Sequence, residues 1–133
     1  MANPNIIALT SIIGNTAYVI PSTTSVSVAW THNGSTALTG LTPASGTVNK
    51  ITSIVATNVT ATAASISIGI SNNSTYGSGT PYYLAYQISV PAYSALVVTD
   101  KTTGFYVTEN QSVGVIAGTG SALNIVATIE AIT

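Results

Sequence analysis

Hydrophobic and polar residues alternate along most of this chain. The segment Ala64–Ser71 reads ASISIGIS, with alanine and isoleucine at one set of alternate positions and serine and glycine at the other. Because successive side chains of a β-strand point to opposite faces of a sheet, this period of two predicts a half-buried strand. Further strands are predicted at Asn5–Ile13, Ser25–Trp30, Lys50–Val59, Tyr83–Val90, Ala95–Thr99, Phe105–Glu109, Ser112–Ala117 and Leu123–Glu130. In the strand before Pro91, the alternation predicts that Leu84, Tyr86, Ile88 and Val90 face the core.

Turn-forming residues separate these segments. Asn33-Gly34 is a hairpin-turn signal, Gly77–Pro81 indicates a longer loop, and Pro91 divides two predicted strands. No segment shows a helical period of 3.6. The pattern therefore predicts an all-β fold: a single-domain antiparallel β-sandwich or jelly-roll-like barrel of about eight strands, spanning residues 1–133.

Two regions fit this scheme less well. Residues 31–49 are rich in threonine, glycine, alanine and serine, and we expect a loop-rich insertion there. Residues 1–13 are apolar and uncharged, with a proline near their start. We expect them to form either an edge strand of the chain's own sheet or an arm that pairs with a neighbouring subunit.

Charge is scarce, which narrows the range of partners. Only 4% of the 133 residues are charged, against about 25% in an ordinary domain, and the net charge is -1. With two lysines and no arginine, the chain has no basic surface for nucleic acid or an anionic membrane. A net charge near zero gives little mutual repulsion, which favours self-association.

Residues suited to catalysis or metal binding are few. The one histidine, His32, follows Trp30 and precedes a turn, where we expect it to lie at a loop tip. The acidic residues Asp100, Glu109 and Glu130 would have to meet in space to form a glycosidase-like pair. No metal, nucleotide or serine-hydrolase motif occurs. The sequence therefore predicts no enzyme, no cofactor and no metal site.

Aromatic residues suggest contact surfaces instead. Five of the tyrosines lie around the Gly77–Pro81 loop, and they have three interpretations: packing at one end of the sandwich, a protein interface, or, with Trp30, stacking on a sugar. The predicted interface residues are Ile6, Ile7, Leu9, Tyr76, Tyr82, Tyr83 and Tyr93.

Three stretches resemble a family of small β-rich virion structural proteins of tailed phages, cyanophages above all. They read KITSIVATNVTATAASISIGI, YYLAYQISVPAYSALVVTDKTTGFYVTENQSVGVIAG and LNIVATIEAI. The positions that match the family pattern are Val55–Asn58, Ile88–Lys101, Tyr106–Val113 and Val126–Ile132, whereas Thr31–Gly46 has no counterpart. The resemblance implies a structural protein of the particle.

Several functions follow as expectations. The leading one is a capsid decoration, or cement, protein that binds between capsomers on the capsid exterior and stabilises the head shell. Its partners would be the major capsid protein or other virion proteins, and copies of itself in a homo-oligomer, a trimer or higher, with no nucleic acid and no membrane. The alternatives are a tail, baseplate or fibre-associated component and, in another class, a carbohydrate-binding β-sandwich.

Overall fold

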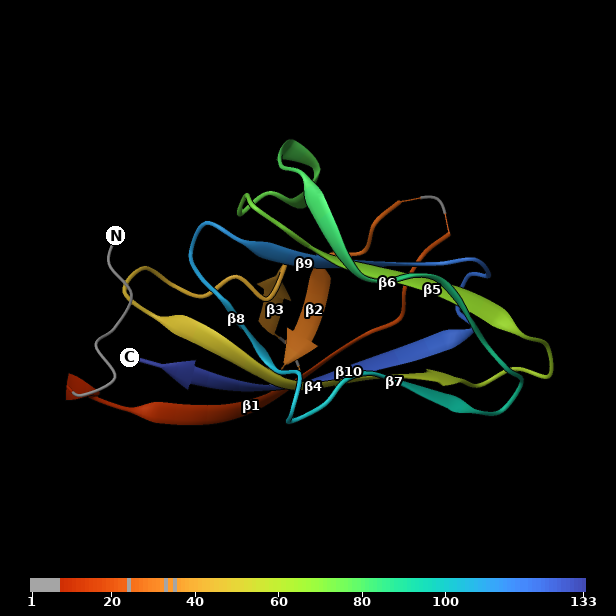
Figure 1. Ribbon diagram of the computed structural model, residues 1–133, viewed down its shortest axis with the longest axis horizontal. Helices are drawn as coiled ribbons and strands as arrows, with labels where there is room; N and C mark the ends of the chain where they lie inside the picture. Colours follow the sequence, from red (N-terminus) through yellow and green to blue (C-terminus); the bar gives the residue numbers. More distant parts are fainter. Residues whose placement is uncertain (1–7, 24, 33, 35) are drawn as a thin grey trace.

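Two antiparallel β-sheets pack against each other around a hydrophobic core (Figure 1). The computed structural model describes residues 8–133 except 24, 33 and 35. Its strands are β1 (Ile12–Val19), β2 (Ala29–His32), β3 (Thr36–Thr39), β4 (Val48–Asn58), β5 (Ala64–Ser71), β6 (Pro81–Val90), β7 (Ala95–Thr99), β8 (Phe105–Val107), β9 (Ser112–Ala117) and β10 (Leu123–Ile132). A short 3-10 helix, η2 (Tyr76–Ser78), lies between β5 and β6. The predicted all-β, single-domain sandwich is confirmed.

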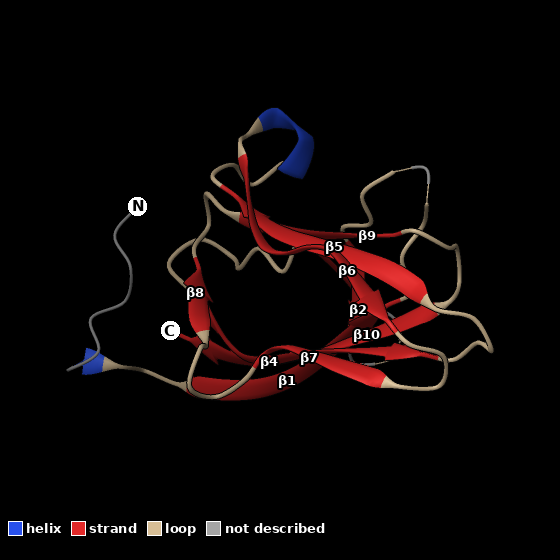
Figure 2. Cartoon of the chain, turned by 45° about the vertical axis from the view of Figure 1, so that its right-hand side comes forward, coloured by secondary structure: helices blue, strands red, loops and turns tan. Residues whose placement is uncertain are grey.

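The two sheets differ in width. The large sheet has seven strands in the order β3-β2-β1-β10-β4-β7, with β8 also paired to β4. The small sheet has three, in the order β6-β5-β9. The large sheet curls, so that β2 and β8 rise from its floor toward the small sheet (Figure 2). Its inner face is therefore enclosed, while the outer face of β1, β10, β4 and β7 points away from the core.

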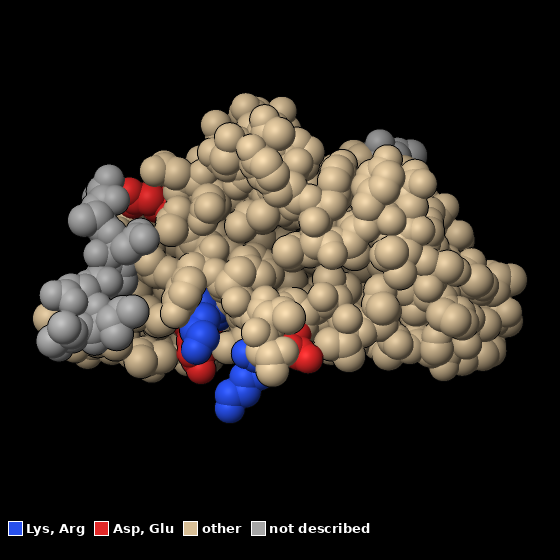
Figure 3. Space-filling view, viewed as in Figure 1, with Lys and Arg blue, Asp and Glu red and all other residues tan. Residues whose placement is uncertain are grey.

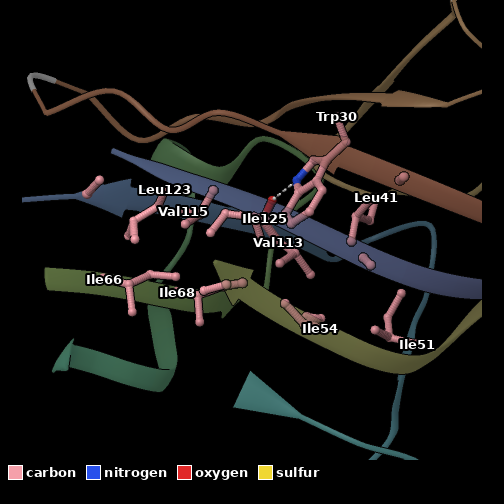
Figure 4. Close-up of a cluster of buried hydrophobic side chains, with 14 of the residues drawn as sticks. Trp30, Leu41, Ile51, Ile54, Ile66, Ile68, Val113, Val115, Leu123 and Ile125 are labelled. Atoms are coloured by element: carbon pink, nitrogen blue, oxygen red, sulfur yellow. Dashed lines mark hydrogen bonds between the residues drawn. The ribbon is translucent and has the colours of Figure 1, made fainter. Parts of the chain in front are cut away.

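Alternate residues of both sheets meet in the core. Ile66 and Ile68 of the small sheet lie opposite Ile51, Ile54 and Ile125 of the large sheet, and all five are fully buried. Ile66, Ile68 and Ile125 occupy the apolar phase of the alternation, as the sequence predicts, whereas Ile51 and Ile54 both face inward because the pairing of β4 with β10 shifts register between them. Trp30 lies among the same side chains (Figure 4), and its indole N–H donates a hydrogen bond to the backbone carbonyl of Val113 at 3.2 Å.

The outer edge of β9 is closed by the chain that precedes β2 and by the residue that follows β3. Ser27 exchanges two backbone hydrogen bonds with Val115, at 2.7 and 3.1 Å. The Val113 amide donates to Gly40 at 2.6 Å, and the Ala117 amide donates to Ser22 at 3.1 Å. These bonds satisfy backbone groups that an edge strand would otherwise leave unpaired. The small sheet is therefore joined to the large one along β9, and β6 is its free edge.

The N-terminal half differs from the prediction. Of the strand predicted at Asn5–Ile13, residues 5–7 lie outside the described residues. They include Ile6 and Ile7, which are two of the predicted interface residues. In the described part, β1 begins only at Ile12 and continues to Val19, paired with β10 from Ile132 to Ile125. Its inward positions include Asn15 and Ala17. Such small or polar inward residues give a weak hydrophobic alternation, which explains the wrong boundary.

The expected loop-rich insertion at 31–49 is also wrong in part. It contains the end of β2, all of β3 and the start of β4. The strands β2 and β3 form a hairpin in which Trp30 pairs with Leu38, and Gly34 in its turn has a φ of 80°. A positive φ is the conformation that the Asn33-Gly34 signal predicts. The strand β3 lies at the edge of the large sheet, and the residues in and around it are mostly small and polar.

The predicted orientation of β6 is wrong. Of the four residues expected in the core, only Val90 is buried, whereas Leu84, Tyr86 and Ile88 are 39%, 58% and 42% exposed. The pairing with β5 shifts register twice between Ile88 and Tyr83. Ile88 pairs with Ile66 before either bulge, so it keeps the core side and is exposed because β6 is the free edge. Beyond Ile88, each bulge inserts an unpaired residue and reverses the phase of the alternation, so a continuous pattern in the sequence does not stay on one face.

Candidate functional site

The charged side chains do not assemble a reactive centre in the part of the chain that the structure describes. Lys50 and Glu130 form an exposed ion pair, with Nζ and Oε2 3.6 Å apart, on neighbouring strands of the large sheet. Asp100 accepts hydrogen bonds from the Thr102 hydroxyl at 2.6 Å and amide at 2.9 Å. These bonds hold the pKa of Asp100 below its usual value and order the turn between β7 and β8. Glu109 lies in the connection from β8 to β9.

Two residues considered for chemistry or sugar binding lie elsewhere than expected. His32 is the last residue of β2, paired with Ala17 and Thr36, and does not lie at a loop tip. Trp30 is 0% exposed, so the expectation that it could stack on a sugar is wrong. Among the described residues, no group of three histidine, cysteine, aspartate or glutamate side chains could hold a metal ion.

Exposed aromatic and aliphatic side chains follow the free edge of the small sheet. We define the tyrosine strip as Tyr82, Tyr83, Leu84, Tyr86 and Ile88 of β6 with Tyr93 in the turn that follows; all six are exposed. The rings of Tyr83 and Tyr86 are in contact, with centroids 4.7 Å apart and planes tilted by 59°. No charged residue occurs anywhere between Lys50 and Asp100. Figure 3 shows the resulting broad uncharged surface, with the charged side chains gathered at its lower and left margins.

Tyr93 ends the strip in an unusual conformation. Its φ is 51°, in the left-handed region that favours glycine, and its side chain is 74% exposed. The Ser94 amide closes the turn by donating to the Pro91 carbonyl at 3.3 Å. For a bulky residue the left-handed conformation costs about 1–2 kcal/mol. The ring gains little from packing to offset this cost within the monomer.

Tyr76, also a predicted interface residue, has a packing role. Gly69 of β5 pairs with Gly114 of β9, and the Tyr76 side chain covers this glycine pair. A Cβ added at Gly114 would lie 2.9 Å from the Tyr76 ring, and one added at Gly69 would lie 2.7 Å from its hydroxyl oxygen. Burial against this surface, and secondarily Tyr83, raises the pKa of Tyr76.

The predicted interface residues are thus not gathered in one place. Tyr82, Tyr83 and Tyr93 are exposed on the tyrosine strip, Tyr76 is half-buried over the glycine pair, and Leu9 is half-buried near the start of β1. Sequence reasoning missed Leu84, Tyr86 and Ile88, because it placed them in the core. The sequence feature that could have indicated an exposed edge strand is the proline that begins β6, because proline in a sheet is found at edges and strand starts.

A second surface, without net charge, lies on the outer face of the large sheet. Tyr18 pairs with Val126, Val126 with Val55, and Val55 with Val97, so that four apolar side chains form a row across β1, β10, β4 and β7. We call these four residues the apolar row. Tyr18 and Val126, with Val19, Ile20, Asn124 and Ile125, also line a shallow hollow of about 270 Å³. The only charged residues on these four strands are Lys50 and Glu130, which neutralise each other.

Comparisons with known proteins leave the function open. No family model, curated protein sequence or solved structure matches the chain. Within the described residues, no helix has the length and apolar character needed to cross a membrane. The tyrosine strip and the apolar row are two surfaces of the described residues that are rich in apolar side chains.

The glycine pair beneath Tyr76 leads to a test of local packing. We expect Gly114→Ala to destabilise the fold by about 1–3 kcal/mol, because the new methyl group meets the Tyr76 ring and a Val26 methyl group. The control is Gly14→Ala in β1, where an added Cβ meets nothing within 4 Å. Denaturant titration of both variants measures the difference. Equal stabilities would contradict the packing role of Tyr76.

Proposed function

We propose that this chain is a structural protein of a phage virion, and that it decorates the head shell by binding other virion proteins through the tyrosine strip. The observation that carries the proposal is Tyr93, a large aromatic side chain held exposed in a strained turn at the end of the strip. Strain of this kind persists where the surroundings impose it, and it concentrates at functional positions. A partner that buries the ring would add packing contacts that offset the cost of the strained backbone at Tyr93.

The composition of the strip also supports protein contact. Tyrosine is enriched among the residues that dominate binding energy at protein interfaces, and charged residues are depleted from interface cores. The tyrosine strip contains four tyrosines and two aliphatic residues. If binding removed about 500 Å² of apolar surface from water, the gross gain would be roughly 12 kcal/mol, offset in large part by association entropy and side-chain ordering.

The same geometry favours a protein partner over a sugar. The planes of Tyr83 and Tyr86 are tilted by 59°, so they do not form one flat stacking platform. The resemblance to small virion proteins of tailed phages supports a structural protein of the particle without fixing its part, and we propose the head ahead of the tail, baseplate or fibre. The expected homo-oligomer, a trimer or higher, and the capsid exterior as its location remain predictions of the same proposal.

Stoichiometry in purified particles tests the assignment. A decoration protein repeats with the shell, so we expect its molar ratio to the major capsid protein to be a simple fraction. Quantitative mass spectrometry of purified phage particles measures this ratio. A trace ratio would favour a tail or baseplate component. Absence from the particle would contradict the virion assignment.

Replacement of Tyr93 separates binding from folding. Tyr93→Gly removes the ring and relieves the positive φ, so we expect a stability change within about 1 kcal/mol. Binding to particles assembled without the chain should weaken by roughly 10-fold or more, as expected for an interface tyrosine. Co-sedimentation with those particles measures the binding, and thermal unfolding measures the stability.

The matched control is Ser121→Gly. Ser121 is also exposed and has a φ of 59°, but it lies outside the tyrosine strip, before β10. This variant relieves the same kind of backbone strain, and we expect it to bind like the unaltered chain. If Tyr93→Gly also binds like the unaltered chain, Tyr93 has no part in attachment.

A further inference from the structure

We propose that two copies of this chain bind each other through the outer face of β1, β10, β4 and β7, with the apolar row at the centre of the contact. This inference goes beyond the proposed function and does not rest on it, because it concerns the purified chain alone. The occupant of the face is a second copy, for reasons of composition, charge and area.

The composition of the face suits a contact between protein subunits. The apolar row crosses β7 at its middle and β1 one residue before its end, and the paired residues on the next rows are short and uncharged: Thr16, Thr128 and Ser53 on one side, Asn124, Thr57 and Ala95 on the other. Short side chains let two sheets approach closely. Their hydroxyl and amide groups form a polar border around the apolar centre, as in other protein interfaces.

A two-fold axis makes this face complementary to itself. If the axis lies in the interface, parallel to the strands and between β10 and β4, Val126 of one copy lies over Val55 of the other, and Tyr18 lies over Val97. The same axis places Lys50 of each copy over Glu130 of the other, since these two residues are paired across β4 and β10. Opposite charges therefore face each other twice and like charges do not meet. An isologous contact of this kind closes with two copies.

The face is large enough for a weak dimer. Four strands spaced about 4.8 Å apart and eight residues long, at about 3.3 Å per residue, cover roughly 500 Å². Two such faces together bury about 1,000 Å², which is near the lower limit for a specific interface. We therefore expect association in roughly the micromolar range. A trimer or higher assembly would need another surface, such as the tyrosine strip.

The first test replaces Val126 with a charged residue. Val126 is 41% exposed, so lysine can reach water in the monomer, but in the dimer it would be desolvated against the partner. We expect Val126→Lys to raise the dimer dissociation constant about 10-fold or more, measured by sedimentation equilibrium. The control is Val59→Lys, the same change at a valine that is 47% exposed in the loop after β4. This control should associate like the unaltered chain, and circular dichroism checks that both variants fold.

The second test does not depend on a disruptive change. Because the chain has no cysteine, Val126→Cys introduces a unique thiol. Sheets that pack face to face lie roughly 10 Å apart, so a thiol-reactive cross-linker of that reach should join two copies at position 126. Val59→Cys is the control and should give little cross-linked dimer at the same concentration. Equal cross-linking of both variants, or a chain that stays monomeric well above micromolar concentration, would overturn the proposal.

Discussion

The hydrogen bond from the Trp30 indole to the Val113 carbonyl joins the two sheets along β9, the edge strand of the small sheet, and the closure of the fold on that side depends on it. Trp30 comes from β2 in the large sheet, and Val113 from β9 in the small one. The donor and the acceptor are both buried, so each would be costly to leave unpaired. The segments around Ser27 and Gly40 then complete the backbone bonding of β9. Closure along β9 leaves β6 as the free edge of the small sheet.

This arrangement explains why exposed apolar residues collect in two places. At β6, the initial Pro81, two bulges and the strained turn at Tyr93 make regular pairing with another strand unfavourable. The exposed edge therefore offers side chains to a partner more readily than backbone groups. On the large sheet, the inner face is enclosed by the curl, and its outer face carries short polar residues around the apolar row. Both surfaces lack the net charge that keeps a free monomer apart from its neighbours.

The sequence predicts the regular parts of the fold well. Ala64–Ser71, Ala95–Thr99 and Ser112–Ala117 were expected as strands and coincide with β5, β7 and β9. In β5 and β9 the alternate apolar residues are buried, together with most of the residues between them, and no bulge interrupts the pairing of the two strands. Prediction fails at β1, where the inward residues include asparagine and alanine, and at β6, where bulges reverse the phase. A bulge depends on backbone pairing with a partner strand, which alternation within one segment does not report.

The candidate surfaces were predictable only in part. The clustering of Tyr82, Tyr83 and Tyr93 is visible in the sequence, and all three are exposed. The apolar row is not visible there, because Tyr18, Val126, Val55 and Val97 come from four separate segments. Each one stands between two apolar residues in its own segment, so the sequence does not mark it as an outward-facing position. They are brought together only by the strand order β1-β10-β4-β7 and its register.

The central claim is that the tyrosine strip and the apolar row are contact surfaces for protein, and tyrosine footprinting tests it most directly. Tyr93 and Tyr82 report on the tyrosine strip, and Tyr18 reports on the apolar row, while half-buried Tyr76 serves as an internal reference. Radical labelling followed by mass spectrometry compares the dilute free chain with the chain in purified phage particles. The account predicts that Tyr93, Tyr82 and Tyr18 lose reactivity in the particle relative to Tyr76. Unchanged reactivity of all three would contradict it.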